Sequence, residues 1–303
     1  MARRRKKTWL DRISDFSIIA WLINPLTLII CVFVLALISW DRYQDRLETP
    51  LTQPIDQRTL FVNQPPSWIK TDVRKVAIQD SRLEEIQLGE PRALEMVAAS
   101  FAVQPWVKSV NRIRKTSTGV HVNLQYRKPV ALVEIGKNSL YPVDDECVLL
   151  DSRDFSGPDA RLNYWRVSMP APITNGLLAG YPWDDVRVSD SVLIANAWNG
   201  KQAGTGLMRI VNRSGPTRDR LRLQAYELWT LNGTIIIWGN PPGQEVKGEA
   251  SAEQKIEAVL TYVKKRGSLE KLEKGIYDVR GGTLVRSSAH LASEDAGFVR
   301  QTY

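Results

Sequence analysis

Two runs of alternating apolar residues, separated by a short polar turn, constrain the fold more than any other feature of this sequence. The runs are Val107–Ile113 and Val120–Tyr126, and the turn between them is Thr116-Ser117-Thr118-Gly119. In the second run apolar residues alternate strictly with polar ones, which is the period of a strand with one buried face. A short turn that ends in glycine between two such runs predicts a β-hairpin. Pro129 lacks a main-chain donor, so we expect the second strand to end near Arg127-Lys128.

The segment before this hairpin predicts one strand and two helices. Val73–Ile78 has the composition of a strand, and Ser81 with Glu84 forms a capping-box pattern for a short helix through Leu88. A second helix is expected after Pro91, because its apolar residues repeat at helical spacing on one face: Leu94, Val97, Ala98 and Phe101. The resulting order, β-α-α-β-β, is that of a compact α+β module with two helices on one face of a small sheet.

The chain after Val130 is predicted to be mostly β. Asn232-Gly233 between two apolar runs is the strongest short signal of a hairpin, and it predicts paired strands within 225–238. Helices are expected at 188–198 and 253–265, and residues 151–186 have no clear pattern. Shorter strands are predicted at 131–135, 140–143, 148–150, 207–211, 276–279 and 283–285. The expected class is therefore α+β, with a mostly antiparallel β domain that carries a C-terminal helix.

An uncharged apolar run, Phe16–Trp40, follows a basic segment at residues 1–15. A helix needs about 20 apolar residues to cross the hydrocarbon core of a membrane, so the run predicts a transmembrane helix. The Arg and Lys residues before it predict an N-terminus in the cytoplasm, with the rest of the chain on the other side of a cell inner membrane. A cleaved signal peptide is the alternative, but Leu37-Ile38-Ser39 is a poor cleavage site.

Charge and cysteine content exclude some classes of function. The formal charge is +8, but +4 of it lies within residues 1–15 and residues 16–40 are uncharged, so the 263 residues at 41–303 are nearly balanced. A nucleic-acid-binding protein would spread basic residues over its folded part, and we therefore expect no nucleic-acid partner. Cys31 lies in the apolar run, which leaves Cys147 without a disulfide partner and favours a buried structural thiol.

The sequence contains no recognisable catalytic constellation, so we expect a protein that is not an enzyme and that needs no cofactor. His121 and His290 are the only histidines, and the sequence has no nucleophile-elbow, phosphate-loop or Cys-x-x-Cys motif. The acidic turn Asp144-Asp145-Glu146 is a possible divalent-cation site, but acidic turns between strands are common, and we predict no metal. Paired carboxylates for glycoside cleavage can lie far apart in a sequence, so a glycoside hydrolase stays an alternative at this point.

Several short motifs, in order along the chain, resemble the bacterial cell-division protein family FtsQ/DivIB. They begin with Pro105-Trp106-Val107 at the entry to the hairpin and Tyr126-Arg127-Lys128-Pro129-Val130-Ala131 at its exit. Val143-Asp144 before Cys147–Leu150 follows, then Ile236–Gly239, and finally Tyr277-Asp278-Val279-Arg280. The sequence departs from the family at Tyr126, where an acid is usual, at Glu146-Cys147, where Asp-Gly is usual, and at Gly281-Gly282, where many relatives have a bulky residue.

The resemblance implies a division of the chain into six parts. These are a basic cytoplasmic tail at 1–15, the transmembrane helix at 16–40, a juxtamembrane stalk at 41–67, a POTRA domain at 68–131, the family's β domain at 132–288 and a flexible tail at 289–303. The residues that mark the POTRA domain are Pro105, Trp106, Val107, Arg127 and Pro129.

The resemblance also implies a non-enzymatic scaffold of the cell-division machinery, located at the division septum. Family members bind FtsB/FtsL-type partners by adding a strand of the partner to the edge of their last strands, and an unpaired edge suits this role. Carried over by position, the binding residues are Asp278, Arg280, Thr283, Leu284, Val285, Arg286 and Ser287. A salt bridge between Asp278 and Arg280 is an equal alternative for those two. The competing functions are a POTRA-bearing factor for secretion or outer-membrane assembly, and an anchored cell-wall hydrolase.

Overall fold

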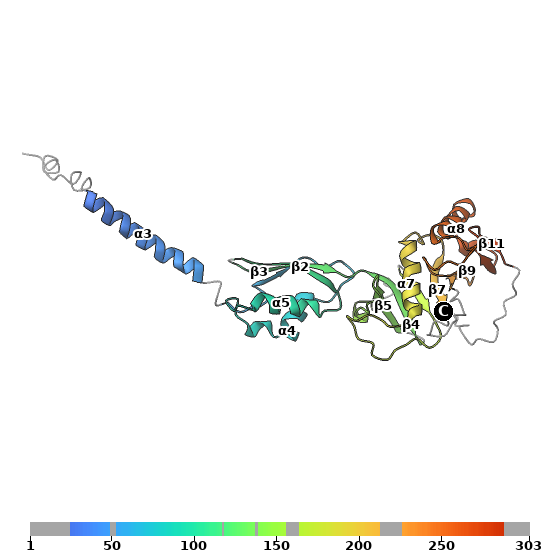
Figure 1. Ribbon diagram of the computed structural model, residues 1–303, viewed down its shortest axis with the longest axis horizontal. Helices are drawn as coiled ribbons and strands as arrows, with labels where there is room; N and C mark the ends of the chain where they lie inside the picture. Colours follow the sequence, from blue (N-terminus) through green and yellow to red (C-terminus); the bar gives the residue numbers. More distant parts are fainter. Residues whose placement is uncertain are drawn as a thin grey trace, which may run out of the picture.

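The computed structural model describes residues 25–48, 53–116, 118–136, 139–155, 164–212 and 226–287. They form an elongated molecule with three parts: helix α3 (Pro25–Glu48), a small α+β unit, and a larger unit around an eight-stranded sheet (Figure 1). The expected α+β class is confirmed by the five α-helices and two mixed sheets of these residues. The predicted tails at 1–15 and 289–303 lie outside the described residues.

The predicted transmembrane helix at 16–40 is wrong. In the part of the chain that the structure describes, no helix is long and apolar enough to cross a membrane. Helix α3 as described runs from Pro25 to Glu48, and it continues past Trp40 into a charged sequence that contains Asp41, Arg42 and Asp45. Residues 16–24 of the predicted span lie outside the described residues.

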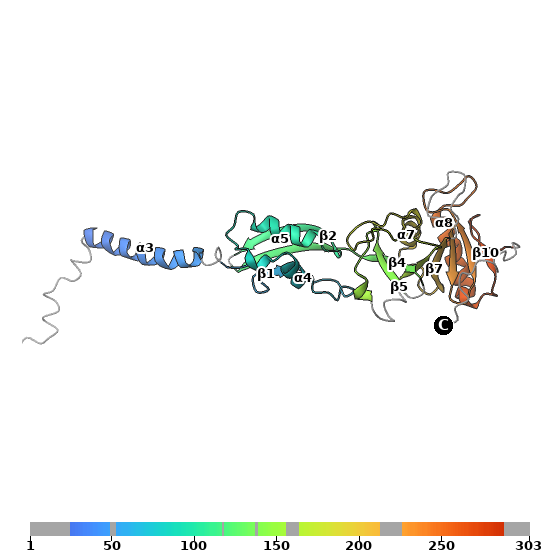
Figure 2. The same cartoon turned by 90° about the horizontal axis from the view of Figure 1, so that it is seen from below.

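The small unit has the order β-α-α-β-β, but its first two elements are not the expected ones, since the first strand lies elsewhere and the helix predicted from Ser81 to Leu88 is only a 3₁₀ turn. The elements are β1 (Leu60–Val62), α4 (Val73–Asp80), the 3₁₀ turn η1 (Leu83–Glu85), α5 (Ala93–Ala102), β2 (Val107–Thr116) and β3 (Gly119–Tyr126). The sheet has the order β1-β3-β2, with β1 parallel and β2 antiparallel to β3. Figure 2 shows α5 lying across this sheet.

The strand predicted at Val73–Ile78 is the helix α4. Its N-cap is Asp72, whose side chain accepts hydrogen bonds from the main-chain N–H groups of Arg74 and Lys75. This cap satisfies donors that a helix end otherwise exposes, and it outweighs the β propensity of the valines. The stalk predicted at 41–67 is also wrong towards its end, because Ile55 and Leu60 are fully buried in the core of the small unit.

The predicted hairpin is confirmed in β2 and β3. The two strands pair from Val107 opposite Tyr126 to Thr116 opposite Gly119, with irregularities near both Lys108 and Asn111. The predicted end of the second strand is confirmed as well, since β3 ends at Tyr126 and a new strand begins at Pro129.

The larger unit is built on a sheet with the strand order β11-β10-β9-β8-β7-β6-β4-β5. Its strands are β4 (Pro129–Ile135), β5 (Ser139–Asp144), β6 (Trp165–Ser168), β7 (Leu207–Asn212), β8 (Tyr226–Thr230), β9 (Ile235–Gly239), β10 (Ile276–Asp278) and β11 (Val285–Arg286). Three of the seven pairings are parallel: β4 with β6, β6 with β7, and β9 with β10. The other four pairings are antiparallel, so antiparallel pairing is in the majority, as expected, but only by one pair, and the sheet is mixed.

Two helices cover one face of this sheet. They are α7 (Val186–Trp198) and α8 (Ala252–Arg266), and both agree with the predicted helices. A 3₁₀ turn, η3 (Leu269–Lys271), follows α8, and another, η2 (Ser152–Phe155), precedes β6. Strand β6 was not predicted, and the strand expected at 148–150 contributes only isolated bridges, to Val143 and Pro182.

Strand β4 connects the cores of the two units. Ala131 and Val133 belong to the core beneath α7 and α8, whereas Leu132 belongs to the core of the small unit. Leu150 joins the small unit's core as well. Because neighbouring side chains of a strand point to opposite faces, one strand serves both cores. The two units are thus packed against each other rather than joined by a free linker.

Candidate functional site: an open sheet edge beside a groove

The last strand of the chain's described part forms one edge of the eight-stranded sheet. Strand β11 pairs antiparallel with β10, with Arg286 opposite Tyr277 and Val285 opposite Asp278. The main-chain N–H of Ser287 donates to the carbonyl of Ile276 over 2.8 Å. On its other side, β11 has no partner strand among the described residues. An edge strand therefore lies at the predicted location of the open edge, although this strand is short.

The hydrogen-bond pattern identifies which main-chain groups of β11 face outwards. In an antiparallel pair, residues that bond to the neighbouring strand alternate with residues whose main-chain groups point away from it. Because Ser287 bonds to Ile276 on β10, the alternation directs the N–H and C=O groups of Arg286 away from β10. Arg286 thus offers one donor and one acceptor to an added strand, whereas Val285 bonds towards β10.

The turn that leads into β11 is fixed at several points. The N–H of Gly282 donates to the carbonyl of Val279 over 2.9 Å, and the N–H of Ala250 donates to the carbonyl of Arg280 over 2.7 Å. Gly282 has a φ of 77°, a left-handed conformation that glycine adopts without strain. The two glycines at 281–282 therefore belong to the turn, and the family's bulky residue would be strained at position 282.

Asp278 and Arg280 form a salt bridge with each other. Arg280 Nη2 lies 2.6 Å from Asp278 Oδ2, and the main-chain N–H of Arg280 donates to Asp278 Oδ1 over 2.9 Å. Burial opposes ionisation of Asp278, but the hydrogen bonds from Arg280 outweigh it and hold the pKa of this carboxyl below its ordinary value. The same contact raises the pKa of Arg280. The salt-bridge alternative for these two residues is confirmed.

The side chains of β11 itself differ in character. Val285 is an exposed apolar residue, with 55% of its surface accessible to solvent. Arg286 donates through Nη1 and Nη2 to the carboxylate of Glu273 at 2.8 and 3.1 Å. This hydrogen-bonded contact raises the pKa of the Arg286 guanidinium. The edge therefore presents an apolar side chain beside a neutralised charge.

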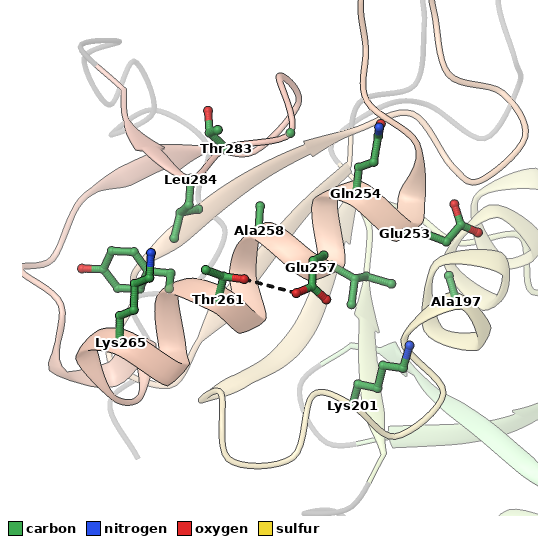
Figure 3. A pocket seen from close by; sticks show the side chains of 13 residues that line it. Ala197, Lys201, Glu253, Gln254, Glu257, Ala258, Thr261, Lys265, Thr283 and Leu284 are labelled. Carbon is green, nitrogen blue, oxygen red and sulfur yellow. Dashed lines mark hydrogen bonds between the residues drawn. The ribbon is translucent and has the colours of Figure 1, made fainter.

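A groove runs alongside the edge. It has a volume of about 750 Å³ and lies between the end of α7, one face of α8 and the segment from Gly282 to Leu284. Figure 3 shows Leu284 and Lys265 at one end, and Lys201 and Glu253 at the other, with Thr261 donating to Glu257 between them. The further lining residues are Ala197, Gln254, Ile256, Ala258, Tyr262 and Thr283. Apolar walls with charges of both signs are suited to the side chains of a peptide.

A buried ion pair between Lys255 of α8 and Glu249 lies next to the groove. The sequence analysis did not identify this pair. Lys255 Nζ lies 2.6 Å from Glu249 Oε1, with the two side chains 0% and 3% exposed. The ammonium group also lies 4.9 Å from the centre of the Trp238 ring. Burial opposes ionisation of Glu249, but hydrogen bonds from Asn240 and Lys255 hold its pKa below the ordinary value. A lysine within an amphipathic helix gives no signal that distinguishes a buried position from an exposed one.

The residues that were predicted to mark the POTRA domain lie away from the edge strand β11. Instead they lie at the junction of the two units, where Trp106 and Val107 are buried and Pro129 begins β4. Arg127 lies 2.5 Å from Asp144 Oδ2 and 2.9 Å from Glu146 Oε2. Pro105, at the start of the hairpin, approaches the loop at Gly180. These residues therefore hold the units together and form no part of the open edge.

The acidic side chains of the turn at 144–146 form salt bridges with basic residues of the protein itself. Asp144 is fully buried and contacts Arg127, while Lys108 lies 3.1 Å from Asp145 and 3.2 Å from Glu146. Hydrogen bonds from Arg127 and Lys108 lower the pKa of Glu146. Within the described ranges no group of three or more possible ligands for a metal ion occurs. The turn thus contributes to the junction between the units.

Together, the fold and the site define a two-unit α+β protein with an open sheet edge beside a groove. No known protein family matches the chain, and no curated protein matches it significantly.

Proposed function

We propose that this protein is a non-enzymatic scaffold of the bacterial cell-division machinery. Its partners would be FtsB/FtsL-type division proteins, which bind by adding a strand to β11. The observation that carries this proposal is the outward direction of the Arg286 main chain on an edge strand without a described neighbour. The resemblance of the sequence motifs to the FtsQ/DivIB family supports the choice of partner.

The groove supports strand addition at this particular edge. Thr283 and Leu284 line the groove and lead directly into β11, so an added strand would bring its flanking residues to the groove. Val285 offers an exposed apolar contact at the same place. Main-chain hydrogen bonds would supply part of the affinity, and contacts in the groove would supply the rest together with the specificity.

Binding is tested with two substitutions at one position. Arg286→Pro removes the outward N–H, whereas Arg286→Ala keeps it and removes only the contact with Glu273. A partner carbonyl left without its donor costs about 1–3 kcal/mol, so we expect Arg286→Pro to weaken capture of an FtsB/FtsL-type partner by about tenfold. Arg286→Ala should change it little. Equal retention of the partner by both variants would contradict strand addition at β11.

The cellular role is tested separately by a fluorescent fusion in dividing cells. The proposal places the protein at the division septum, so the signal should concentrate at midcell. A signal spread evenly around the cell would argue against a division role, even if the edge binds a partner in vitro. The expected position of the folded units outside the cytoplasm stays a prediction, and protease accessibility in intact spheroplasts measures it.

A further inference from the structure

The three-stranded sheet of the small unit has one face that no described element covers. Helices α4 and α5 lie on the opposite face, against the buried residues Val120, Val122 and Leu124 (Figure 1). The alternation of the strands places the other side chains on the open face. We call this surface the polar sheet face, and its residues are Phe61, Ser109, Asn111, Arg112, Arg114, His121, Asn123 and Gln125.

The amide oxygens of this face accept hydrogen bonds from neighbouring side chains. Ser109 Oγ lies 2.9 Å from Asn111 Oδ1 and 3.1 Å from Gln125 Oε1. Asn111 Nδ2 donates to Asn123 Oδ1 over 3.4 Å. These contacts use the acceptor oxygens, and they leave the amide N–H groups of Asn123 and Gln125 as donors to a ligand. The face is therefore richer in donors than in acceptors.

Two guanidinium groups add to this excess of donors. Arg112 lies opposite Asn123 and Arg114 opposite His121, so both stand among the amides. Both side chains are exposed, and within the described residues no carboxylate forms a salt bridge with either. By contrast, Lys108 on the same strand is held by Asp145 and Glu146. Arg112 and Arg114 are thus available to carboxylates from outside the chain.

An aromatic pair lies beside these donors. The rings of Phe61 and His121 stack with their centres 4.6 Å apart and their planes at 15°. Phe61 is 37% exposed, although it is a large apolar residue on a short strand. Aromatic rings provide an apolar surface of fixed shape. Such a surface can contact the C–H groups of a sugar ring while neighbouring amides bind its hydroxyl groups.

We propose that the polar sheet face binds an anionic polysaccharide. Its carboxylates would pair with Arg112 and Arg114, its hydroxyl groups would bind Asn123 and Gln125, and one sugar ring would lie against Phe61 and His121. A protein partner would need more apolar anchors than Phe61 alone. A nucleic acid would need cations for many phosphates and several stacking platforms. This binding is separate from that of the edge at β11.

The test uses the full chain and polygalacturonate as the probe, with dextran as a neutral polysaccharide for comparison. The double variant Arg112→Ala/Arg114→Ala removes both guanidinium groups of the polar sheet face. A hydrogen bond to a charged group is worth about 1.5–3 kcal/mol, so we expect at least about tenfold weaker binding of polygalacturonate. Phe61→Ala should weaken it by about threefold or more through lost ring contact. The matched control, Lys75→Ala/Arg92→Ala, removes two exposed positive charges on the helix side of the sheet.

The proposal predicts binding to polygalacturonate but not to dextran, with the control variant binding like the unaltered protein. Thermal unfolding would verify that each variant is folded. An equal loss of binding in the control variant would show a general charge effect and overturn the site. Tighter binding to single-stranded DNA or to polyglutamate than to polygalacturonate would overturn the choice of ligand, and so would no binding at all. The Arg286→Pro variant should bind the polysaccharide unchanged.

Discussion

The two sheets each end in an exposed edge strand, but the two edges differ in length, charge and regularity. In the small sheet, β2 is ten residues long, has two irregularities in its pairing and carries Lys108, Arg112, Arg114 and Lys115. In the large sheet, β11 has only two residues and presents the exposed Val285 beside a groove. Basic side chains and bulges are the features that protect edges from unwanted pairing.

This difference indicates which edge is available to a partner. A long regular edge would be a general template for aggregation, and β2 is interrupted and charged along its length. The short edge at β11 exposes few main-chain groups, so it offers little to a non-specific strand. Specific pairing at β11 would then depend on the groove, because one or two hydrogen bonds supply little affinity.

The largest effect is expected from breaking the buried pair behind β11. Lys255→Met leaves Glu249 buried without its cation, which costs about 3–5 kcal/mol. The free energy of unfolding, from urea denaturation followed by tryptophan fluorescence, should fall by that amount. The double variant Lys255→Met/Glu249→Gln should recover most of the loss, because no buried charge remains. If the double variant is as unstable as the single one, the ion pair is not the cause.

A smaller effect is expected at the junction, where β5 ends at Asp144. Asp144→Ala removes a fully buried carboxylate that accepts hydrogen bonds from Arg127 and from the N–H of Val148. We expect a loss of about 2–4 kcal/mol in unfolding free energy. Asp145→Ala is the matched control, because its half-exposed contact with Lys108 should contribute less than about 1 kcal/mol. Similar losses in both variants would contradict a special role for Asp144.

The comparison of the edges is tested directly by giving β11 a residue typical of β2. Val285→Lys places a charge on the open edge, and we expect about tenfold weaker capture of an FtsB/FtsL-type partner. The unfolding free energy should change by less than about 0.5 kcal/mol, because the side chain is exposed. Val285→Thr, which stays β-branched and uncharged, serves as the control. Unchanged capture by Val285→Lys would show that the partner binds elsewhere.

The smallest effect is a dependence of stability on pH. The lowered pKa of Asp278 means that its contribution is fully present above the unfolded value of about 3.9 and is lost as the pH falls through the lower folded value. Since Arg280 is 51% exposed, solvent screening limits this contribution to less than about 1 kcal/mol. Asp278→Asn should therefore lose less stability than the unaltered protein between pH 5 and pH 3 in urea titrations. Equal losses would indicate that the salt bridge contributes nothing.

Strong local signals made part of this fold predictable. The alternation before and after Gly119 predicted β2 and β3, and Asn232-Gly233 predicted β8 and β9. The strand β1 was missed because three residues are too few to show a period. The helix α4 was mistaken for a strand because valine favours strands, whereas the cap by Asp72 decided the structure.

The position of the edge strand was predictable, but its detail was not. Motif order alone placed the edge near 283–287, yet the direction of the Arg286 main chain depends on its register with β10. A sequence cannot supply that register for a two-residue strand. The polar sheet face was equally hidden, because Phe61 and His121 are distant in sequence and meet only through the parallel pairing of β1 with β3.

The shared strand β4 has a mechanical consequence. Leu132 is anchored in one core, and its neighbours Ala131 and Val133 are anchored in the other. A pulling force applied to the small unit would therefore be transmitted through β4 directly to the interior of the large sheet. No flexible linker would extend before the sheet bears the force. Under tension the molecule should respond as one stiff rod, and its first rupture should occur where β4 leaves the smaller core.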